Sequence, residues 1–385
     1  MIWRSAWLII WLTLRPLLQI QVVGRERIPK EGGALVLANH TTLLDFLICL
    51  WGVYRPVHAL GTEQVFRLPV AGWLLTQLNG APISKGAKDG AAVRHLVDAY
   101  KAGRLSGMFP EGKRSWTGRP LPITRGTGRL VKSLGCPVVY CKVTTGFMQH
   151  PRWAKWPRRV PWRMEYSAPE HLPPDATIEE INDIIASRLH IDPDKVALPK
   201  GSWGFRLAEG LPAFLWACPS CFALESLTIP ARDRDCVVCS ACGGRWRVDL
   251  ACWLNPETEE LPRLTVAAAR DRLSNHFAAG THALTLEAAD TLVSRVSRTM
   301  PKPAPLERGL ARLEDDALVI LDEQGAELWR LDYSEMTAVL LQVGSALHIR
   351  VEGANYQIDP GAESRLKWHH FLLTRLKAAG YTVKH

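Results

Sequence analysis

The stretch ALVLANHTTLLD, residues 34–45, joins an apolar run to two residues that can carry chemistry. Residues 34–38 are all apolar, and a run of this length is typical of a buried strand. His40 follows at the strand exit, a place from which side chains project into a cleft. Asp45 can fold back and accept a hydrogen bond from one ring nitrogen of His40, which leaves the other nitrogen as a base. Taken alone, the spacing also fits a helix-capping Asn39 followed by an incidental histidine.

A second stretch, FPEGKRS at residues 109–115, ends another short apolar run in a Pro-Glu-Gly turn. Such a turn exposes backbone N–H groups, and Lys113 and Arg114 add two positive charges beside them. Phosphate oxygens bind well to this combination of donors. The stretch therefore predicts a phosphate site.

The two stretches in this order resemble the glycerolipid acyltransferases of the 1-acylglycerol-3-phosphate acyltransferase type. That family carries Asn-His-x4-Asp and later Phe-Pro-Glu-Gly-Thr-Arg-Ser. It also has a Gly-containing stretch ending in Arg between them and a late Pro-Val-Val-Pro-like strand. The corresponding stretches here are GAPISK at residues 80–85 and GCPVVY at residues 135–140. The resemblance covers roughly residues 15–210.

The resemblance implies acyl transfer from a thioester to an alcohol. His40 would take the proton from the acceptor hydroxyl, and Asp45 would hold the imidazole tautomer and stabilise the imidazolium. The acceptor alcohol attacks directly, so no serine or cysteine nucleophile is needed. The residues implied in binding the acceptor's glycerol phosphate are Asn39, Lys85, Glu111, Gly112, Lys113 and Arg114. Asn39 is also expected to fix the turn that presents His40.

Three departures from the family pattern leave the acceptor headgroup open. Lys85 stands where the family generally has Arg, and Lys cannot form a bidentate fork to phosphate. Lys113 replaces the usual Thr, and the late strand ends in Tyr140 rather than Pro. The sequence still favours a lysophospholipid acceptor, most simply lysophosphatidate. The acyl donor is expected to be a coenzyme A thioester (acyl-CoA) or acyl carrier protein (acyl-ACP).

Charge is unevenly distributed along the chain. The formal net charge is +9, but residues 1–165 hold 24 Lys/Arg against 8 Asp/Glu, whereas the rest holds 23 against 30. Nine of the 15 tryptophans lie in the same basic segment. Tryptophan combined with cations favours an anionic membrane surface over nucleic acid as the partner.

The N-terminal residues 1–23 are apolar and place Trp3, Trp7 and Trp11 on one helical stripe. Their longest uncharged run has ten residues, whereas a membrane span needs about 20. No small-residue cleavage site follows, which argues against a signal peptide. We expect a helix lying in the interface at the cytoplasmic face of a membrane. The alternative is a buried core helix.

A loop at residues 151–163 holds five cations and three tryptophans. Its prolines disfavour a helix. The composition suggests a second membrane contact. The alternative is a solvated loop whose tryptophans pack back on the domain.

The region from Gly24 to about Gly210 alternates short strands with amphipathic helices. Strands are expected at 34–38, 105–109 and 137–143, and a helix at 89–102. Strand–helix alternation of this kind predicts an α/β layer fold with a mainly parallel sheet.

Four cysteines have the spacing of a structural zinc ribbon. Cys218-x2-Cys221 is followed by a gap of 17 residues and then by Cys239-x2-Cys242. Four thiolates close the coordination sphere, which predicts a structural rather than a catalytic zinc. Cys236 with Cys239 is an alternative second pair, and the glycines after Cys242 favour the pair given first.

The other cysteines, Cys49, Cys136, Cys141 and Cys252, are expected to be packing residues. The total of nine is odd, and a reducing compartment fits this chain better than disulfides do.

The last hundred residues predict short strands closed by an amphipathic helix at 364–379. This pattern resembles a PH-like barrel, a β-rich α+β module, and an unrelated α+β domain is the alternative. The expected domains are an acyltransferase domain at 1–212, a zinc ribbon at 213–254, a linker helix at 255–281 and the PH-like barrel at 282–385.

Two other functions stay open. The acyltransferase fold could serve a non-catalytic membrane adaptor, against which the intact His40, Asp45, Glu111 and Arg114 argue. A zinc-ribbon nucleic-acid binder is disfavoured by the acidic balance beyond residue 165.

Overall fold

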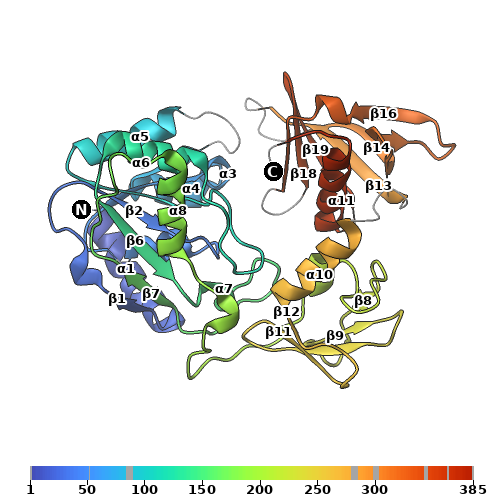
Figure 1. Ribbon diagram of the computed structural model, residues 1–385, viewed down its shortest axis with the longest axis horizontal. Coiled ribbons are helices and arrows are strands. Elements are labelled where there is room, and N and C mark those ends of the chain that lie inside the picture. The colour runs from blue at the N-terminus through green and yellow to red at the C-terminus, as the bar shows by residue number, and fades with distance from the viewer. Residues whose placement is uncertain are drawn as a thin grey trace. The chain divides into compact units, whose positions relative to one another are not determined.

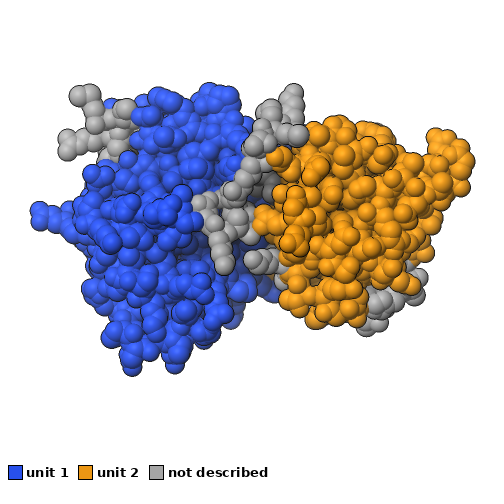
Figure 2. Space-filling view, turned by 90° about the horizontal axis from the view of Figure 1, so that it is seen from above, with its two compact units in different colours: residues 1–207, 249–253 blue, residues 208–248, 254–385 orange. Residues whose placement is uncertain are grey.

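The computed structural model describes residues 2–51, 53–83, 90–278, 285–297, 303–341, 346–361 and 364–383. The chain forms two compact units, shown in separate colours in Figure 2. The first comprises residues 1–207 with 249–253, and the second residues 208–248 with 254–385. The structure separates the chain into these two units only, and the finer division into four domains stays a prediction.

A seven-stranded sheet forms the centre of the first unit, in the order β1-β7-β6-β2-β5-β3-β4. Figure 1 labels β1, β7, β6 and β2 of this sheet. Its strands are β1 (Gln21–Val23), β2 (Ala34–Ala38), β3 (Val57–Thr62), β4 (Gly80–Ile83), β5 (Leu105–Met108), β6 (Val138–Val143) and β7 (Arg163–Tyr166). Each pairing is parallel except that of β6 with β7. The mainly parallel sheet agrees with the prediction, with one antiparallel pair added.

Helices cover both faces of this sheet. They are α1 (Ile2–Leu18), α2 (Asp45–Trp51), α3 (Glu63–Phe66), α4 (Pro69–Gln77), α5 (Gly90–Lys101), α6 (Arg125–Leu134), α7 (Gly146–Gln149) and α8 (Ile178–Leu189). All five residues of β2 are buried. Leu35 and Leu37 pack with Val131 of α6 and Ile181 of α8, and the alternate β2 residues pack with Ile48 of α2. Burial of both faces explains why this strand reads as an unbroken apolar run.

Helix α1 exposes an apolar surface that includes Leu8, Ile9 and Leu12. Its last residue, Leu18, is buried in the core of the first unit. The side chains of Trp3, Trp7 and Trp11, which define the predicted stripe, lie outside the described residues. None of the described helices combines the length and apolar character that a bilayer crossing requires.

The second unit begins with α9 (Leu211–Leu215) and a five-stranded sheet in the order β12-β11-β10-β9-β8. The strands are β8 (Leu227–Thr228), β9 (Cys236–Cys239), β10 (Arg245–Val248), β11 (Trp253–Pro256) and β12 (Leu264–Thr265). Neighbours from β8 to β11 pair antiparallel. Helix α10 (Val266–Ala278) follows this sheet.

A second seven-stranded sheet, in the order β16-β15-β14-β13-β19-β18-β17, completes this unit (Figure 1). Its strands are β13 (Leu286–Arg295), β14 (Ala304–Leu313), β15 (Ala317–Leu321), β16 (Glu327–Asp332), β17 (Ala338–Leu341), β18 (Leu347–Val351) and β19 (Ala354–Asp359). The terminal helix α11 (Arg365–Ala378) buries Trp368, Phe371, Leu372 and Leu376. The predicted short strands and closing helix are observed, and the PH-like assignment stays a proposal.

Candidate functional site

The two motifs meet because their strands are parallel neighbours. Leu37 of β2 pairs with Met108 of β5, so both strands end at the same edge of the sheet. His40 lies two residues beyond β2, and Phe109 directly follows β5. Their rings stack with centroids 4.1 Å apart and an interplanar angle of 15°. The packing thus brings FPEGKRS against the histidine loop.

Asp45 holds the imidazole of His40 in one orientation. His40 Nδ1 lies 2.9 Å from Asp45 Oδ2, and the aspartate side chain is fully buried. The same oxygen accepts the backbone N–H groups of Thr41 and Thr42 at 2.6 and 2.8 Å, and Thr42 Oγ1 donates to Oδ1 at 3.1 Å. An ionised carboxylate only accepts hydrogen bonds, so Nδ1 carries the proton and Nε2 is left as the acceptor nitrogen.

Asn39 and Glu111 connect the main chain at His40 to the end of β6 and to the segment that follows β5, and these two strands are the neighbours of β2. Asn39 Nδ2 donates to the Val143 carbonyl at 3.1 Å, and its Oδ1 accepts the Val143 N–H at 2.7 Å. The Glu111 carboxylate accepts the backbone N–H groups of His40 and Leu121, each at 3.2 Å. Both side chains are 4% exposed. Their polar atoms are therefore engaged with the backbone.

Burial raises the pKa of Glu111 to about 7, even though the hydrogen bonds from the His40 and Leu121 N–H groups favour the ionised form. Near neutral pH this side chain is therefore divided between the acid and the carboxylate. Its protonation state is linked directly to the backbone of His40.

A group of cations follows the same turn. Gly112 adopts φ +69°, a left-handed conformation that few other residues tolerate, and Lys113 is exposed next to it. Burial lowers the pKa of Arg114, and burial together with the charge of Arg152 lowers that of Lys113. The guanidinium of Arg114 is thus only partly solvated, whereas Lys113 reaches the surface.

Arg152 belongs to this group and was not predicted as a site residue. It donates from Nη1 to the Arg114 carbonyl at 3.0 Å, and its guanidinium lies 4.0 Å from the centroid of the Trp116 ring. Burial and the charge of Arg114 lower its pKa. Within the described part of the chain, neither Arg114 nor Arg152 forms an ion pair with a carboxylate. The only sequence signal was the cationic 151–163 loop, which was assigned as a whole to a membrane.

The predicted residues of the two acyltransferase motifs lie together at one edge of the sheet. Lys85 lies outside the described residues, so its predicted position beside the phosphate stays a prediction.

An apolar pocket lies next to Phe109. Phe109, which stacks on His40, is part of its lining. The remaining lining residues come mainly from the central strands and α2: Val36, Ala38, Phe46, Cys49, Val57, Ala59, Leu60, Gly107 and Met108. The ring that stacks on His40 thus also lines an apolar pocket.

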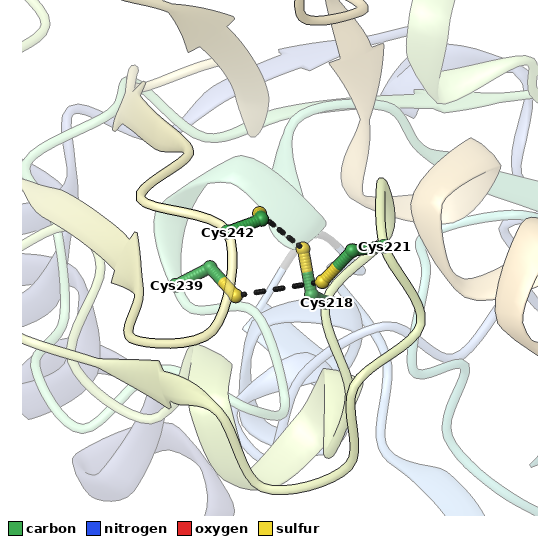
Figure 3. A group of neighbouring side chains, drawn as sticks. All are labelled: Cys218, Cys221, Cys239 and Cys242. Carbon is green, nitrogen blue, oxygen red and sulfur yellow. Dashed lines mark hydrogen bonds between the residues drawn. The ribbon is translucent and has the colours of Figure 1, made fainter.

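The four predicted zinc ligands converge in the second unit (Figure 3). Their Sγ atoms all lie within 4.8 Å of one another, with Cys218 and Cys242 3.8 Å apart and Cys221 and Cys239 3.7 Å apart. A tetrahedral Zn–S bond of about 2.3 Å gives an S···S edge of about 3.8 Å. The sulfur positions therefore fit a zinc ion held by four thiolates.

Cys236 stands apart from the four sulfurs. Its Sγ lies 3.7 Å from the Val237 carbonyl and 3.8 Å from Glu257 Oε1. Gly243, with φ +72°, turns the chain after the second pair, as its position suggested. The geometry supports the pair Cys239 and Cys242 over the pair that includes Cys236.

Comparisons with known proteins give a partial match. Residues 19–143 match the family model described as Acyltransferase. A 1-acyl-sn-glycerol-3-phosphate acyltransferase from Limnanthes alba is 29% identical over 187 residues, which are 46% of this chain and 62% of that protein. The chain thus spans less than two thirds of the length of this curated relative. These sequence matches support an acyltransferase domain in the N-terminal half.

Two solved structures are also similar in part. The 1-acyl-sn-glycerophosphate acyltransferase PlsC from Thermotoga maritima gives a TM-score of 0.41 at 20% identity, covering 49% of this chain and 76% of PlsC. The N-terminal PH domain of human ARAP2 gives 0.21 at 12% identity, covering 26% and 86%. Likenesses at these TM-scores do not establish a shared fold.

We expect one zinc ion per chain, lost in Cys239→Ser and retained in Cys236→Ser. The first substitution removes a thiolate from the four-sulfur cluster, whereas the second leaves the cluster intact. Metal content per chain, measured by elemental analysis of each purified variant, tests this. Loss of zinc from the Cys236 variant together with retention in Cys242→Ser would contradict the assignment.

Because of Glu111, the free energy of unfolding of the first unit should fall as pH rises. The folded pKa of about 7 exceeds the ordinary value of 4.5, so its stabilisation is complete below pH 4.5 and is lost as pH rises through 7. Relative to Glu111→Gln, the wild-type free energy of unfolding should fall by about 3 kcal/mol over this range. Urea unfolding at several pH values measures it, with the exposed Glu31→Gln as the control. Parallel stability curves for wild type and Glu111→Gln would refute the linkage.

Proposed function

We propose that this chain is a membrane-associated acyltransferase. It transfers an acyl chain from acyl-CoA or acyl-ACP to the free hydroxyl of a lysophospholipid, most simply lysophosphatidate to give phosphatidate. The observation that carries the proposal is the hydrogen-bonded His40–Asp45 pair, whose imidazole stacks on Phe109 at the start of the motif that supplies the cations after β5. The family-model match over residues 19–143 supports the same reaction class.

His40 acts as the general base in this mechanism. Its Nε2 takes the proton of the acceptor hydroxyl while the hydroxyl oxygen attacks the thioester carbonyl. Asp45 stabilises the imidazolium that forms, through the hydrogen bond at Nδ1. The tetrahedral intermediate then expels the thiol, which receives the proton from His40. The new ester bond replaces the thioester bond, and the enzyme returns to its starting protonation state.

The cation group provides the site for the acceptor's phosphate. Among the described residues the guanidinium groups of Arg114 and Arg152 form no ion pair, although the charge of Asp45 acts on Arg114, and Lys113 adds a third charge. Charge-assisted hydrogen bonds from such groups suit a phosphate monoester. Gly112 shapes the turn, and Lys85 is kept in the site by resemblance alone. Asn39 and Glu111 act as positioning residues, since their polar atoms bind the backbone.

Lipid substrates reach this site most directly from a membrane surface. Large apolar side chains are exposed on the loop after β2 and on α4, with Leu43 at 55%, Val70 at 79% and Trp73 at 62%. Helix α1 adds Leu8, Ile9 and Leu12 to the exposed apolar surface. We place the protein at the cytoplasmic face of a membrane, with α1 in the interface. The apolar pocket beside Phe109 would receive an acyl chain.

The second unit has a supporting role in this proposal. A structural zinc at the four cysteines would hold the short strands β8 to β11 together, because so small a sheet has little core of its own. The seven antiparallel strands closed by α11 are proposed to be a PH-like module.

Replacement of His40 by Ala should lower kcat by at least about 10²-fold, because loss of a general base typically costs this much. The assay follows thiol release from labelled acyl-CoA or acyl-ACP with a panel of lysolipids. The exposed His171→Ala variant is the matched control and should retain wild-type turnover. Absence of thiol release by the wild-type protein with every donor and acceptor would instead favour a non-catalytic membrane adaptor.

Arg152→Gln should raise KM for lysophosphatidate about tenfold or more, since a charge-assisted hydrogen bond contributes roughly 1.5–3 kcal/mol. The KM for a monoacylglycerol, which has no phosphate, should stay unchanged. Arg129→Gln, which removes an exposed cation of α6, controls for net charge. An equal effect on both acceptors would show that Arg152 does not bind the phosphate.

A further inference from the structure

Two loops of the first unit are joined by a reciprocal pair of backbone hydrogen bonds. The Arg159 N–H donates to the Trp203 carbonyl at 2.9 Å, and the Trp203 N–H donates to the Arg159 carbonyl at 3.0 Å. Residues 151–163 and 196–206 are distant in sequence, and this bridge fixes them side by side. The second of these segments carries no motif that points to a function from sequence.

The joined loops present three exposed aromatic rings. Trp156 is 40% exposed, Trp203 52% and Phe205 46%. The Phe205 centroid lies 5.9 Å from that of Trp156 and 6.4 Å from that of Trp203, so the rings form one continuous surface. We call these three residues the aromatic platform.

The other tryptophans of the 151–163 loop do not contribute to this surface. Trp153 is 5% exposed and Trp162 is fully buried. Two of the three tryptophans thus pack back on the domain, as one of the two alternatives from sequence expected, whereas Trp156 lies on the surface. The rings beside Trp156 come from the neighbouring loop.

The loops that carry the platform are rich in positive charge. The Arg206 guanidinium lies 5.2 Å from the centroid of the Trp156 ring, and Lys155, Arg159 and Lys200 are exposed on the same two loops. Neither residues 151–163 nor residues 196–206 include an Asp or Glu. Exposed aromatic rings on loops that carry cations and no acidic residue are complementary to a layer of anionic lipid headgroups over acyl chains.

The contacts between the rings favour a bilayer over single-stranded nucleic acid. Proteins that stack bases hold ring faces open to receive them. In the platform the Trp156 ring lies tilted beside Phe205, and Arg206 lies over Trp156, so one face of this ring is covered. Edges and exposed flanks of Trp and Phe are suited to the headgroup layer of a membrane instead.

We propose that the aromatic platform docks on the headgroup layer of an anionic phospholipid bilayer, as an anchor separate from α1. One interfacial anchor alone gives marginal, reversible attachment, whereas two together give stable attachment. The proposal extends the membrane association in the proposed function to a defined surface. It rests on the platform residues and not on catalytic turnover.

The test measures vesicle partitioning of the full-length chain without substrate. Flotation compares phosphatidylglycerol–phosphatidylcholine vesicles with pure phosphatidylcholine vesicles. The double variant Trp203→Ala/Phe205→Ala should partition roughly tenfold less strongly to the anionic vesicles, because the second anchor is lost. Tyr381→Ala, which removes an exposed aromatic ring of the second unit, should leave partitioning unchanged.

A second variant keeps the test decisive if the aromatic substitutions disturb folding. Lys155→Gln/Lys200→Gln should weaken partitioning to anionic vesicles and leave the weaker binding to phosphatidylcholine unchanged. Wild-type partitioning by both double variants would overturn the proposal. A second result would also overturn it: the wild-type protein binds a labelled oligonucleotide in a salt-dependent way, and the aromatic double variant loses this binding but still binds vesicles. Turnover of detergent-dispersed substrate should be unchanged in both variants. If the wild-type protein shows no turnover, the proposed acyltransferase reaction is refuted, but the proposed membrane anchor is not.

Discussion

The buried carboxylate of Asp45 is the interaction on which the site depends. A charge removed from water is tolerated only when hydrogen bonds compensate its lost hydration. Asp45 obtains them from the Thr41 and Thr42 N–H groups, the Thr42 hydroxyl and the His40 ring. The need for these bonds folds the loop back on itself and begins α2 with a negative charge at its N-terminus, where the helix dipole favours it. The same bonds that satisfy the carboxylate therefore orient the imidazole.

Orientation of the ring is only useful if the loop is also fixed to the sheet. Asn39 ties the loop to Val143 at the end of β6, and Glu111 ties the His40 N–H to the segment after β5. These two strands lie on either side of β2 in the sheet. His40 is thus held from both neighbouring strands. The side chains of Asn39 and Glu111 are therefore buried because they bind the backbone. The sequence resemblance alone suggests instead that they face the substrate.

The sequence was most informative where an element is buried or its spacing is rigid. β2, β6 and α5 were predicted nearly to their bounds, since a two-sided core requires unbroken apolar runs or a clear helical stripe. The three-residue β1 was missed, because so short a strand is defined by its parallel pairing with β7 and not by its own pattern. The four cysteines were found because ligand spacing is set by metal geometry.

Residues whose role depends on tertiary neighbours could not be predicted in this way. Composition shows that the 151–163 loop is rich in cations and tryptophan, but not which side chains turn inward. Packing buries Trp162 against the sheet core, leaves Trp156 exposed beside Phe205, and directs Arg152 to the Arg114 carbonyl. These directions follow from contacts with segments far away in the sequence.

One loop therefore links the two proposals. Arg152 reaches the cation group of the candidate site, and four residues later Trp156 belongs to the aromatic platform. Between and beside them, Trp153 and Arg158 are buried, and Arg158 donates to the Leu207 carbonyl, which makes this part of the loop a rigid connection. A bilayer that holds the platform would consequently fix the position of Arg152 relative to the lipid headgroups. Docking and headgroup recognition would then be coupled through a few residues of backbone, without any change in the fold.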